Sequence, residues 1–190
     1  MLVYLIPIFI ILPLILMALM IFLPTFIGKN IPPSFSKEKT QVFNIKRDEL
    51  YNLLIDYENY PAWLKYISIV RIEKLDNDKL KIMQTYSNRR TYQELIEVRR
   101  IENTEISIVK MENEFTALWT YILEDAENGR TRLTIKESMY VYHPYLRFML
   151  KYVLIDENGK NDFFRRLRSF INKKIEIINY FIYFSTNTHI

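Results

Sequence analysis

Two carboxylates stand among apolar residues in segments that alternate like β-strands. Glu137 lies in residues 131–142, and Glu94 lies in residues 91–101. Because successive side chains of a strand point to opposite sides, each glutamate shares a face with apolar neighbours, which are Leu133, Ile135, Met139 and Val141 for the first and Tyr92, Ile96 and Val98 for the second. A buried carboxylate is costly unless it is paired, and such groups often mark a cavity.

Three interpretations of these glutamates stay open. They could lie at a sheet edge or pair with an arginine such as Arg147, form the polar floor of a ligand pocket, or act as acid and base in catalysis. His143 is another candidate acid or base, although its place before Pro144 also suits a turn residue. No group of His, Asp and Glu has the spacing of metal ligands. We therefore assign no catalytic residue, metal site or cofactor.

The composition of the 190 residues excludes several classes of function. The chain has no cysteine, which excludes disulfides, thiolate catalysis and cysteine zinc sites. Three glycines are too few for a glycine-rich phosphate loop. The net charge is only +4, and the paired basic residues are spread along the chain among acidic ones. Nucleic-acid binders concentrate such residues on one face, so we expect no nucleic-acid partner.

No charged residue occurs between Met1 and Gly28. A membrane-spanning helix needs about 20 apolar residues, so residues 1–28 predict one transmembrane anchor. A cleaved signal peptide would instead need a basic start and a small-residue cleavage site, and the segment has neither. Lysines follow the segment at Lys29, Lys37 and Lys39. The positive-inside rule then places the C-terminal domain in the cytoplasm.

Beyond a linker at residues 29–38, the pattern predicts an α+β domain. We expect a strand at 39–46, a helix at 47–57 and six further strands at 67–75, 79–87, 91–101, 105–111, 117–125 and 131–142. Short connectors such as residues 76–78 and 87–90 join them. A long helix, clearest at 162–184, carries an apolar stripe of Phe163, Leu167, Phe170, Ile171, Ile175 and Ile178. Charged residues, Arg166 among them, are expected on its opposite face. An antiparallel sheet with one apolar face needs such a helix as its cover.

The stretch DYENYPAW (56–63) combines three aromatic residues with a proline that should break a helix. Tyr57, Tyr60 and Trp63 gain most from burial of their rings. We expect two short helices that meet at Pro61 in a V, with these aromatic side chains closing one end of the core. Direct contact of the aromatic side chains with a ligand is the alternative.

The order of elements resembles the START-like, or SRPBCC, superfamily. More narrowly, the chain is similar to membrane-anchored bacterial polyketide cyclase/dehydrase-like proteins. The motifs that carry this resemblance are Leu23-Pro24 at the end of the anchor, DYENYPAW at 56–63, HPYLR at 143–147 and DENGKNDFFRRL at 156–167. The resemblance implies a helix-grip fold, in which a curved antiparallel sheet wraps round a long C-terminal helix. The expected organisation is an anchor at 1–28, a linker at 29–38, the helix-grip domain at 39–184 and a tail at 185–190.

The resemblance also implies that a hydrophobic small molecule or lipid binds between the sheet and the C-terminal helix, close to the bilayer. The candidate cavity residues are Trp63, Tyr92, Glu94, Trp119, Glu137, Met139, Phe163 and Leu167. A polyketide cyclase-like enzyme that uses Glu137 or His143 is one alternative. A structural or partner-binding module with a filled core is another. Residues 178–184 are expected to overhang the domain and meet the membrane interface, and the oligomeric state stays open.

Overall fold

The computed structural model describes residues 2–75, 79–87, 92–153 and 158–187, and the side chains in these ranges outside 2–12, 14, 158–161 and 178–187. The helices are α1 (Leu2–Lys29), α2 (Arg47–Ile55), α3 (Tyr60–Trp63), α4 (Pro144–Tyr152) and α5 (Asn158–Asn187), with short 3-10 helices η1 (Tyr57–Asn59) and η2 (Glu127–Gly129). The strands are β1 (Ser34–Phe43), β2 (Ile67–Lys74), β3 (Leu80–Tyr86), β4 (Tyr92–Ile101), β5 (Glu105–Met111), β6 (Phe115–Ala126) and β7 (Arg130–Val141). Among the described residues, no helix is both long enough and apolar enough to cross a membrane.

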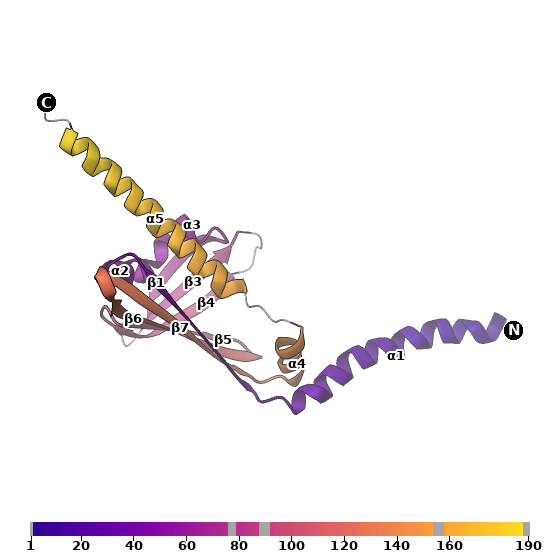
Figure 1. The fold of residues 1–190 in the computed structure, drawn as a ribbon. Coiled ribbons are helices and arrows are strands. Elements are labelled where there is room, and N and C mark those ends of the chain that lie inside the picture. Colours follow the sequence, from indigo (N-terminus) through magenta and orange to yellow (C-terminus); the bar gives the residue numbers. More distant parts are fainter. Residues whose placement is uncertain (1, 76–78, 88–91, 154–157, 188–190) are drawn as a thin grey trace. The chain divides into compact units, whose positions relative to one another are not determined.

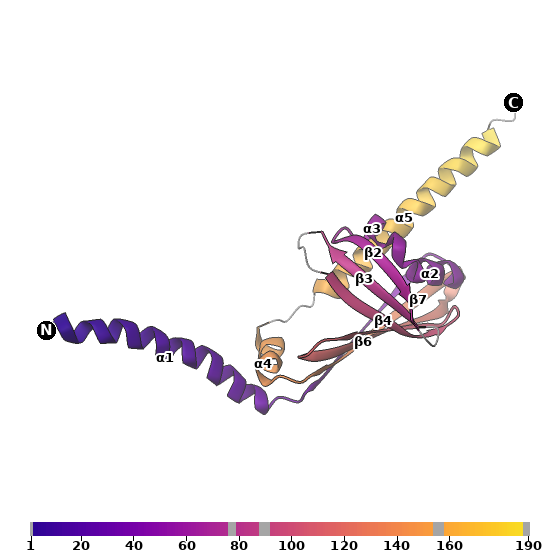
Figure 2. The same ribbon diagram turned by 180° about the vertical axis from the view of Figure 1, so that it is seen from behind.

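The strands form one seven-stranded antiparallel sheet in the order β1-β7-β6-β5-β4-β3-β2 (Figures 1 and 2). Strands β2 to β7 follow one another as a meander. The first strand of the chain, β1, pairs with the last strand, β7. The register places Ile82 opposite Leu95 across β3 and β4. A bulge in β4 between Glu97 and Arg99 shifts its pairing with β5. The expected α+β class and antiparallel sheet are confirmed.

Several boundaries differ from those expected. Strand β1 begins at Ser34, inside the segment expected to be a linker. The helical region after His143 contains two helices, α4 and α5, with residues 154–157 between them outside the described ranges. The expected connectors at 76–78 and 88–90 also lie outside those ranges. The side chains of residues 178–184 are not described, so the expected membrane contact of this segment stays a prediction.

The chain divides into two compact units. The first unit contains Met1–Ser36, Met111–Ala117 and Ser138–Asp156, and the second contains Lys37–Lys110, Leu118–Glu137 and Glu157–Ile190. The second unit therefore contains α2, α3, α5 and most of the sheet. The first unit contains α1 and α4 together with the adjoining ends of β1, β6 and β7.

In the first unit, α1 packs against α4 through a glycine. A Cβ at Gly28 would lie 1.8 Å from the backbone oxygen of Pro144, a separation that real atoms do not reach. Gly28 thus permits the end of α1 to meet the start of α4. Arg147 fixes α4 to the end of β7, because its Nε donates to the carbonyl of Val141 at 2.9 Å and its Nη2 to that of Tyr142 at 3.0 Å.

In the second unit, one face of α5 lies on the sheet and completes the core (Figure 1). Leu167 and Ile171 are buried as the sequence predicts, and Phe164, which was not assigned to the stripe, is only 1% exposed. The ring of Phe164 stacks on Phe43 of β1 with centroids 6.0 Å apart. The expectation that Arg166 faces solvent is wrong, because its guanidinium pairs with Asp162 and lies 5.7 Å from the centre of the Tyr66 ring.

Candidate functional site

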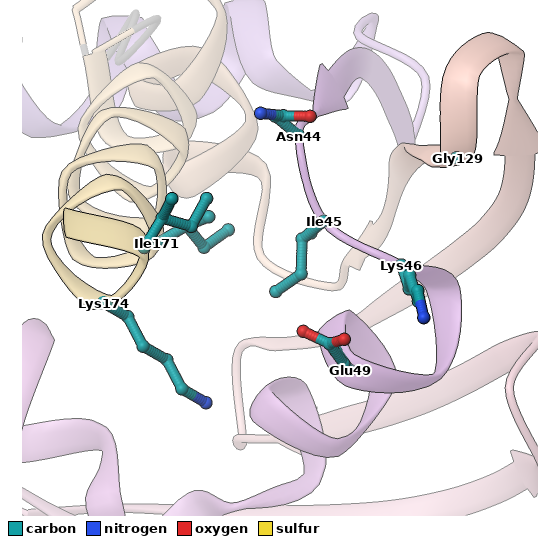
Figure 3. Close-up of a pocket in the computed structure, with 8 residues that line it drawn as sticks. Asn44, Ile45, Lys46, Glu49, Gly129, Ile171 and Lys174 are labelled. Carbon is teal, nitrogen blue, oxygen red and sulfur yellow. The ribbon is translucent and has the colours of Figure 1, made fainter. Parts of the chain in front are cut away.

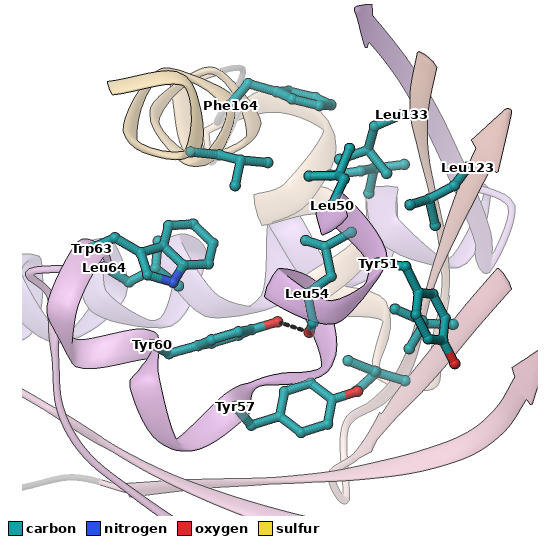
Figure 4. Close-up of a cluster of buried hydrophobic side chains, with 14 of the residues drawn as sticks. Leu50, Tyr51, Leu54, Tyr57, Tyr60, Trp63, Leu64, Leu123, Leu133 and Phe164 are labelled. Carbon is teal, nitrogen blue, oxygen red and sulfur yellow. Dashed lines mark hydrogen bonds between the residues drawn. The ribbon is translucent and has the colours of Figure 1, made fainter. Parts of the chain in front are cut away.

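Among the described residues of the second unit, two regions are candidates for a ligand site. One is an open recess between the start of α2, the β6–β7 turn and α5 (Figure 3). The other is the aromatic interior formed by Trp63 of α3, Phe163 of α5 and side chains of β6 and β7. It adjoins the apolar core, whose buried side chains are drawn in Figure 4. The interior contains several of the residues that the sequence singles out.

The aromatic turn closes one end of this interior. Helix α2 ends at Ile55, the chain turns at Asp56, and Pro61 lies within the first two positions of α3. The break therefore falls before Pro61 and not at it, since a proline is well tolerated in the first turn of a helix. Tyr57, Tyr60 and Trp63 are 1%, 6% and 5% exposed. The three rings are therefore buried in the core, as expected.

Edge-to-face ring contacts hold the plug together. The rings of Tyr57 and Tyr60 have centroids 5.4 Å apart, and those of Tyr60 and Trp63 are 5.1 Å apart. The Tyr60 hydroxyl donates to the carbonyl of Leu54 at 2.6 Å, as Figure 4 shows. Burial raises the pKa of Tyr60 well above its usual value. This hydroxyl is thus a neutral structural donor.

A buried carboxylate fastens the same turn to the sheet. Glu97 of β4 is 4% exposed and accepts the hydroxyl hydrogen of Tyr57. Arg100 binds both oxygens of Glu97, with Nε–Oε1 at 2.7 Å and Nη2–Oε2 at 2.8 Å. The hydrogen bonds that Arg100 donates to Glu97 raise the pKa of Arg100, so the guanidinium keeps its charge. Sequence reasoning missed this triad, because the alternation argument chose the other face of β4.

The indole of Trp63 is buried without a hydrogen-bond acceptor. Its ring meets Phe163 edge to face at 5.4 Å and Phe170 at 6.3 Å, both from α5. Among the described residues, Nε1 of Trp63 is a fully buried polar atom with no partner. A buried donor without an acceptor costs about 1–3 kcal/mol. Trp63 thus offers an N–H that a group absent from the chain could satisfy.

Next to it, the inner faces of β6 and β7 carry aromatic and acidic side chains that are not fully buried. Trp119 and Tyr121 are half-buried, whereas Leu123 further along the same face of β6 is 1% exposed. Trp119 Nε1 donates to Oε1 of Glu137 at 3.2 Å. The Tyr121 ring lies 6.1 Å from Phe163. Burial, together with the nearby Tyr66 and Glu137, raises the pKa of Tyr121. Trp119 and Tyr121 are therefore less fully covered than the core side chain of Leu123.

Of the eight candidate cavity residues, the structure brings Trp63, Trp119, Glu137 and Phe163 together in this interior. Leu167 is fully buried in the adjoining core. Met139 lies on the same face of β7 as Glu137 but belongs to the first unit.

The other two candidates, both on β4, face away from the interior. Tyr92 is 67% exposed, and Glu94 pairs with Lys81 at 3.1 Å near the surface. The inward residues of β4 are Gln93, Leu95 and Glu97, and Gln93 donates to the buried Gln84 at 3.0 Å. Their polar groups are satisfied inside, so the hydrophobicity of the strand does not identify its buried face.

His143 lies in the first unit, apart from these groups. It is exposed at the N-cap of α4, and its carbonyl accepts from the backbone N–H of Arg147 at 3.2 Å. Arg147, in the same unit, donates to the backbone carbonyls of Val141 and Tyr142. In the described ranges, no three His, Asp or Glu side chains converge in a way that could hold a metal ion.

The open recess has a volume of about 240 Å³. Its lining residues are Asn44, Ile45, Lys46, Glu49, Gly129, Ile171, Lys174 and Ile175. Ile171 belongs to the buried core, and Ile45 and Ile175 pack against that core. The floor is therefore apolar and continuous with the core, while the charged groups stand at the rim. Of these residues, the sequence pattern had singled out only Ile171 and Ile175, as members of the apolar stripe of the C-terminal helix.

Comparison with known proteins identifies the architecture. No protein-family model and no curated protein matches the sequence. Solved structures do match: the Zhui aromatase/cyclase from Streptomyces sp. R1128 has 10% identity and a TM-score of 0.59 over 75% of this chain and 96% of that one. Norcoclaurine synthase from Thalictrum flavum has 7% identity and a TM-score of 0.58 over 76% and 90% of the two chains.

A START superfamily protein from Mycobacterium smegmatis is similar as well, with 13% identity and a TM-score of 0.53 over 73% of this chain and 97% of that one. Identities this low show a shared fold and nothing of a shared activity. Together with the sheet order and the position of α5, they establish that this protein has the helix-grip fold of START-like proteins and aromatase/cyclases.

Proposed function

We propose that the protein binds a hydrophobic small molecule or lipid in the aromatic interior between the sheet and α5. The observation that carries this proposal is the buried indole N–H of Trp63, which has no acceptor among the described residues. A ligand with a carbonyl, hydroxyl or carboxylate oxygen would satisfy it. The half-buried Trp119, Tyr121 and Phe163 offer the apolar contact surface that ligand pockets use.

The test is to isolate the full chain and to identify by mass spectrometry the compounds that organic solvent extracts from it. We expect an apolar compound with at least one acceptor oxygen. Trp63→Phe keeps one aromatic ring but removes the indole N–H together with the five-membered ring, so it should reduce retention of that compound about five-fold or more, at least the effect of losing one hydrogen bond.

Tyr92→Phe is the matched control, because it also removes one polar hydrogen but from an exposed side chain. It should leave retention unchanged. An extract without any specific compound, from a protein whose Trp63 N–H is protected from exchange, would instead support a module with a filled core. Equal loss of the compound in both variants would show that the Trp63 N–H does not bind it.

A second candidate function is a polyketide cyclase-like enzyme. The observation in its favour is Glu137, a carboxylate within the aromatic interior that Trp119 orients by its 3.2 Å hydrogen bond. Such a group could exchange a proton with a bound substrate. An enzyme of this kind should lose turnover of its ligand in Glu137→Gln while it still binds the ligand. A protein that only carries the ligand should leave it chemically unchanged, both in the unmodified chain and in Glu137→Gln.

We further propose that residues 1–28 anchor the domain in a membrane. The absence of any charged residue in this segment supports the anchor. Apolar side chains of α1 from Ile15 to Phe26 are largely exposed, which favours an apolar surrounding. Lys29, Lys37 and Lys39 favour a cytoplasmic C-terminal domain.

The absence of cysteine makes the orientation simple to test. A single Glu176→Cys substitution introduces one exposed thiol on α5. In sealed cells, a membrane-impermeant maleimide should label this thiol only after permeabilisation. Labelling of intact cells would show the opposite orientation, and loss of the protein from the membrane fraction at physiological salt would contradict the anchor.

A further inference from the structure

The recess beside α2 has the chemistry of a second binding site, separate from the aromatic interior. Its floor consists of the isoleucines Ile45, Ile171 and Ile175. Its volume of about 240 Å³ lies below the ~300–1,000 Å³ that drug-sized ligands occupy. The recess therefore suits a small molecule with an apolar part of a few carbon atoms.

The rim of the recess determines the charge of such a molecule. Lys46 and Lys174 come from opposite sides of the recess, and Figure 3 shows Glu49 between them in this view. In the part of the chain that the structure describes, no ion pair engages any of the three. Two ammonium groups and one carboxylate leave one net positive charge at the rim.

The charges at the rim favour a monoanionic ligand over a dianionic one. A single negative charge is attracted by both lysines, whereas a second negative charge on the ligand would meet the carboxylate of Glu49. Lysine at an exposed rim also keeps its ammonium group hydrated while its methylene stem covers apolar surface. The rim is thus complementary to a monoanion whose charged end lies at the surface and whose apolar end lies on the isoleucines.

We propose that the recess binds a short-chain alkanoic acid, with the carboxylate at Lys46 and Lys174 and the alkyl chain on the isoleucine floor. Hexanoate is a suitable probe because it is soluble in water. The site does not depend on the ligand of the aromatic interior, because the two regions use different residues.

Isoleucine methyl groups make binding observable in the full chain. With the protein in nanodiscs of neutral lipid and its isoleucine methyls labelled with ¹³C, hexanoate should shift the signals of Ile45, Ile171 and Ile175 saturably. Lys46→Gln and Lys174→Gln should each weaken this binding about five-fold, the effect of losing one exposed ion pair. Glu49→Gln should strengthen it. Lys173→Gln, an exposed lysine on the same helix outside the recess, should change nothing.

Three results would overturn the proposal. The first is hexanoate binding that Lys46→Gln, Lys174→Gln and Lys173→Gln weaken equally, which would indicate general charge attraction. The second is hexylamine binding as tight as hexanoate binding. The third is inorganic phosphate shifting the same methyls more strongly than hexanoate, since a dianion should be disfavoured by Glu49. The indole N–H signal of Trp63 reports the interior separately, so a failure of one site is distinguishable from a failure of the other.

Discussion

At the scale of single residues, Glu97 is the buried charge on which the aromatic turn depends. Its carboxylate is compensated from both sides, by the hydroxyl of Tyr57 and by two donors from Arg100. A charge in the interior is tolerated only with such partners, because its desolvation costs several kcal/mol. The triad therefore joins η1 to β4 with a specificity that apolar contacts alone do not provide.

Glu97→Gln should destabilise the protein strongly. The amide keeps the size of the side chain but removes the charge that binds Arg100. Because the Arg100 side chain is 35% exposed, the cost should be that of a hydrogen bond to a charged group, about 1.5–3 kcal/mol. Glu94→Gln is the matched control on the same strand, and its exposed pair with Lys81 should contribute about 0–1 kcal/mol. Urea unfolding monitored by circular dichroism measures both. Equal effects of the two substitutions would mean that the triad has no special stabilising role.

The sequence led to the wrong face of β4 for a physical reason. Tyr92, Ile96 and Val98 make the outer face more apolar than the inner one, which carries Gln93 and Glu97. The inner polar groups are tolerated because partners from distant segments, Gln84 and Tyr57 among them, satisfy their hydrogen bonds. No local pattern encodes such partners. On β7, where the inner face is mostly aliphatic, the alternation of apolar residues correctly assigned Glu137 to the inner face.

At the scale of elements, α5 stabilises the second unit through one narrow face. Leu167 is fully buried in the core, and Leu167→Ala should cost about 2–5 kcal/mol. Phe170 keeps part of its ring exposed, so Phe170→Ala should cost less. Lys173→Ala on the exposed face should change stability by less than about 0.5 kcal/mol. Denaturant midpoints give this order, and a larger loss for Phe170→Ala than for Leu167→Ala would contradict the burial.

The contact between α1 and α4 depends on the absence of a side chain at Gly28. In Gly28→Ala the new Cβ would overlap the backbone oxygen of Pro144 at 1.8 Å, so the two helix ends must separate. We expect faster amide hydrogen exchange in α4, with the core of the second unit unchanged. Gly129→Ala is the control glycine: it has open space but a φ of +68°, so it should cost about 1–2 kcal/mol by strain alone. Unchanged exchange in α4 would show that this contact is not formed in solution.

At the scale of the whole molecule, the order of elements was predictable, while the division into units was not. Strand alternation, the amphipathic pattern of α5 and the proline-containing aromatic turn each act over a few residues, and each placed its element. The first unit is different, since it joins residues near 28, 114 and 142 that are far apart in the sequence. The recess is unpredictable for the same reason, because its lining comes from three separate segments.

Buried tyrosines give the whole molecule a characteristic response to alkaline pH. Burial raises the pKa of Tyr57, Tyr60 and Tyr121, and it raises the pKa of Tyr66 to about 12 from the usual 10.0. In the unfolded chain these hydroxyls ionise near pH 10. The folded state therefore retains protons that the unfolded state has lost, and by linkage the free energy of unfolding falls as pH rises above that point.

The contribution of these tyrosines is thus fully present below about pH 10 and is lost progressively toward about pH 12. Each tyrosine removes roughly 1.4 kcal/mol per pH unit in this range, so the four together exceed a total stability of ~5–15 kcal/mol within a few pH units. We expect cooperative unfolding near pH 11–12, with the phenolate absorbance of the four tyrosines rising in the same step. Tyr66→Phe should make the decline less steep, whereas Tyr92→Phe at an exposed position should not. Gradual ionisation of all tyrosines near pH 10 in a protein that stays folded would show that these side chains reach water in solution.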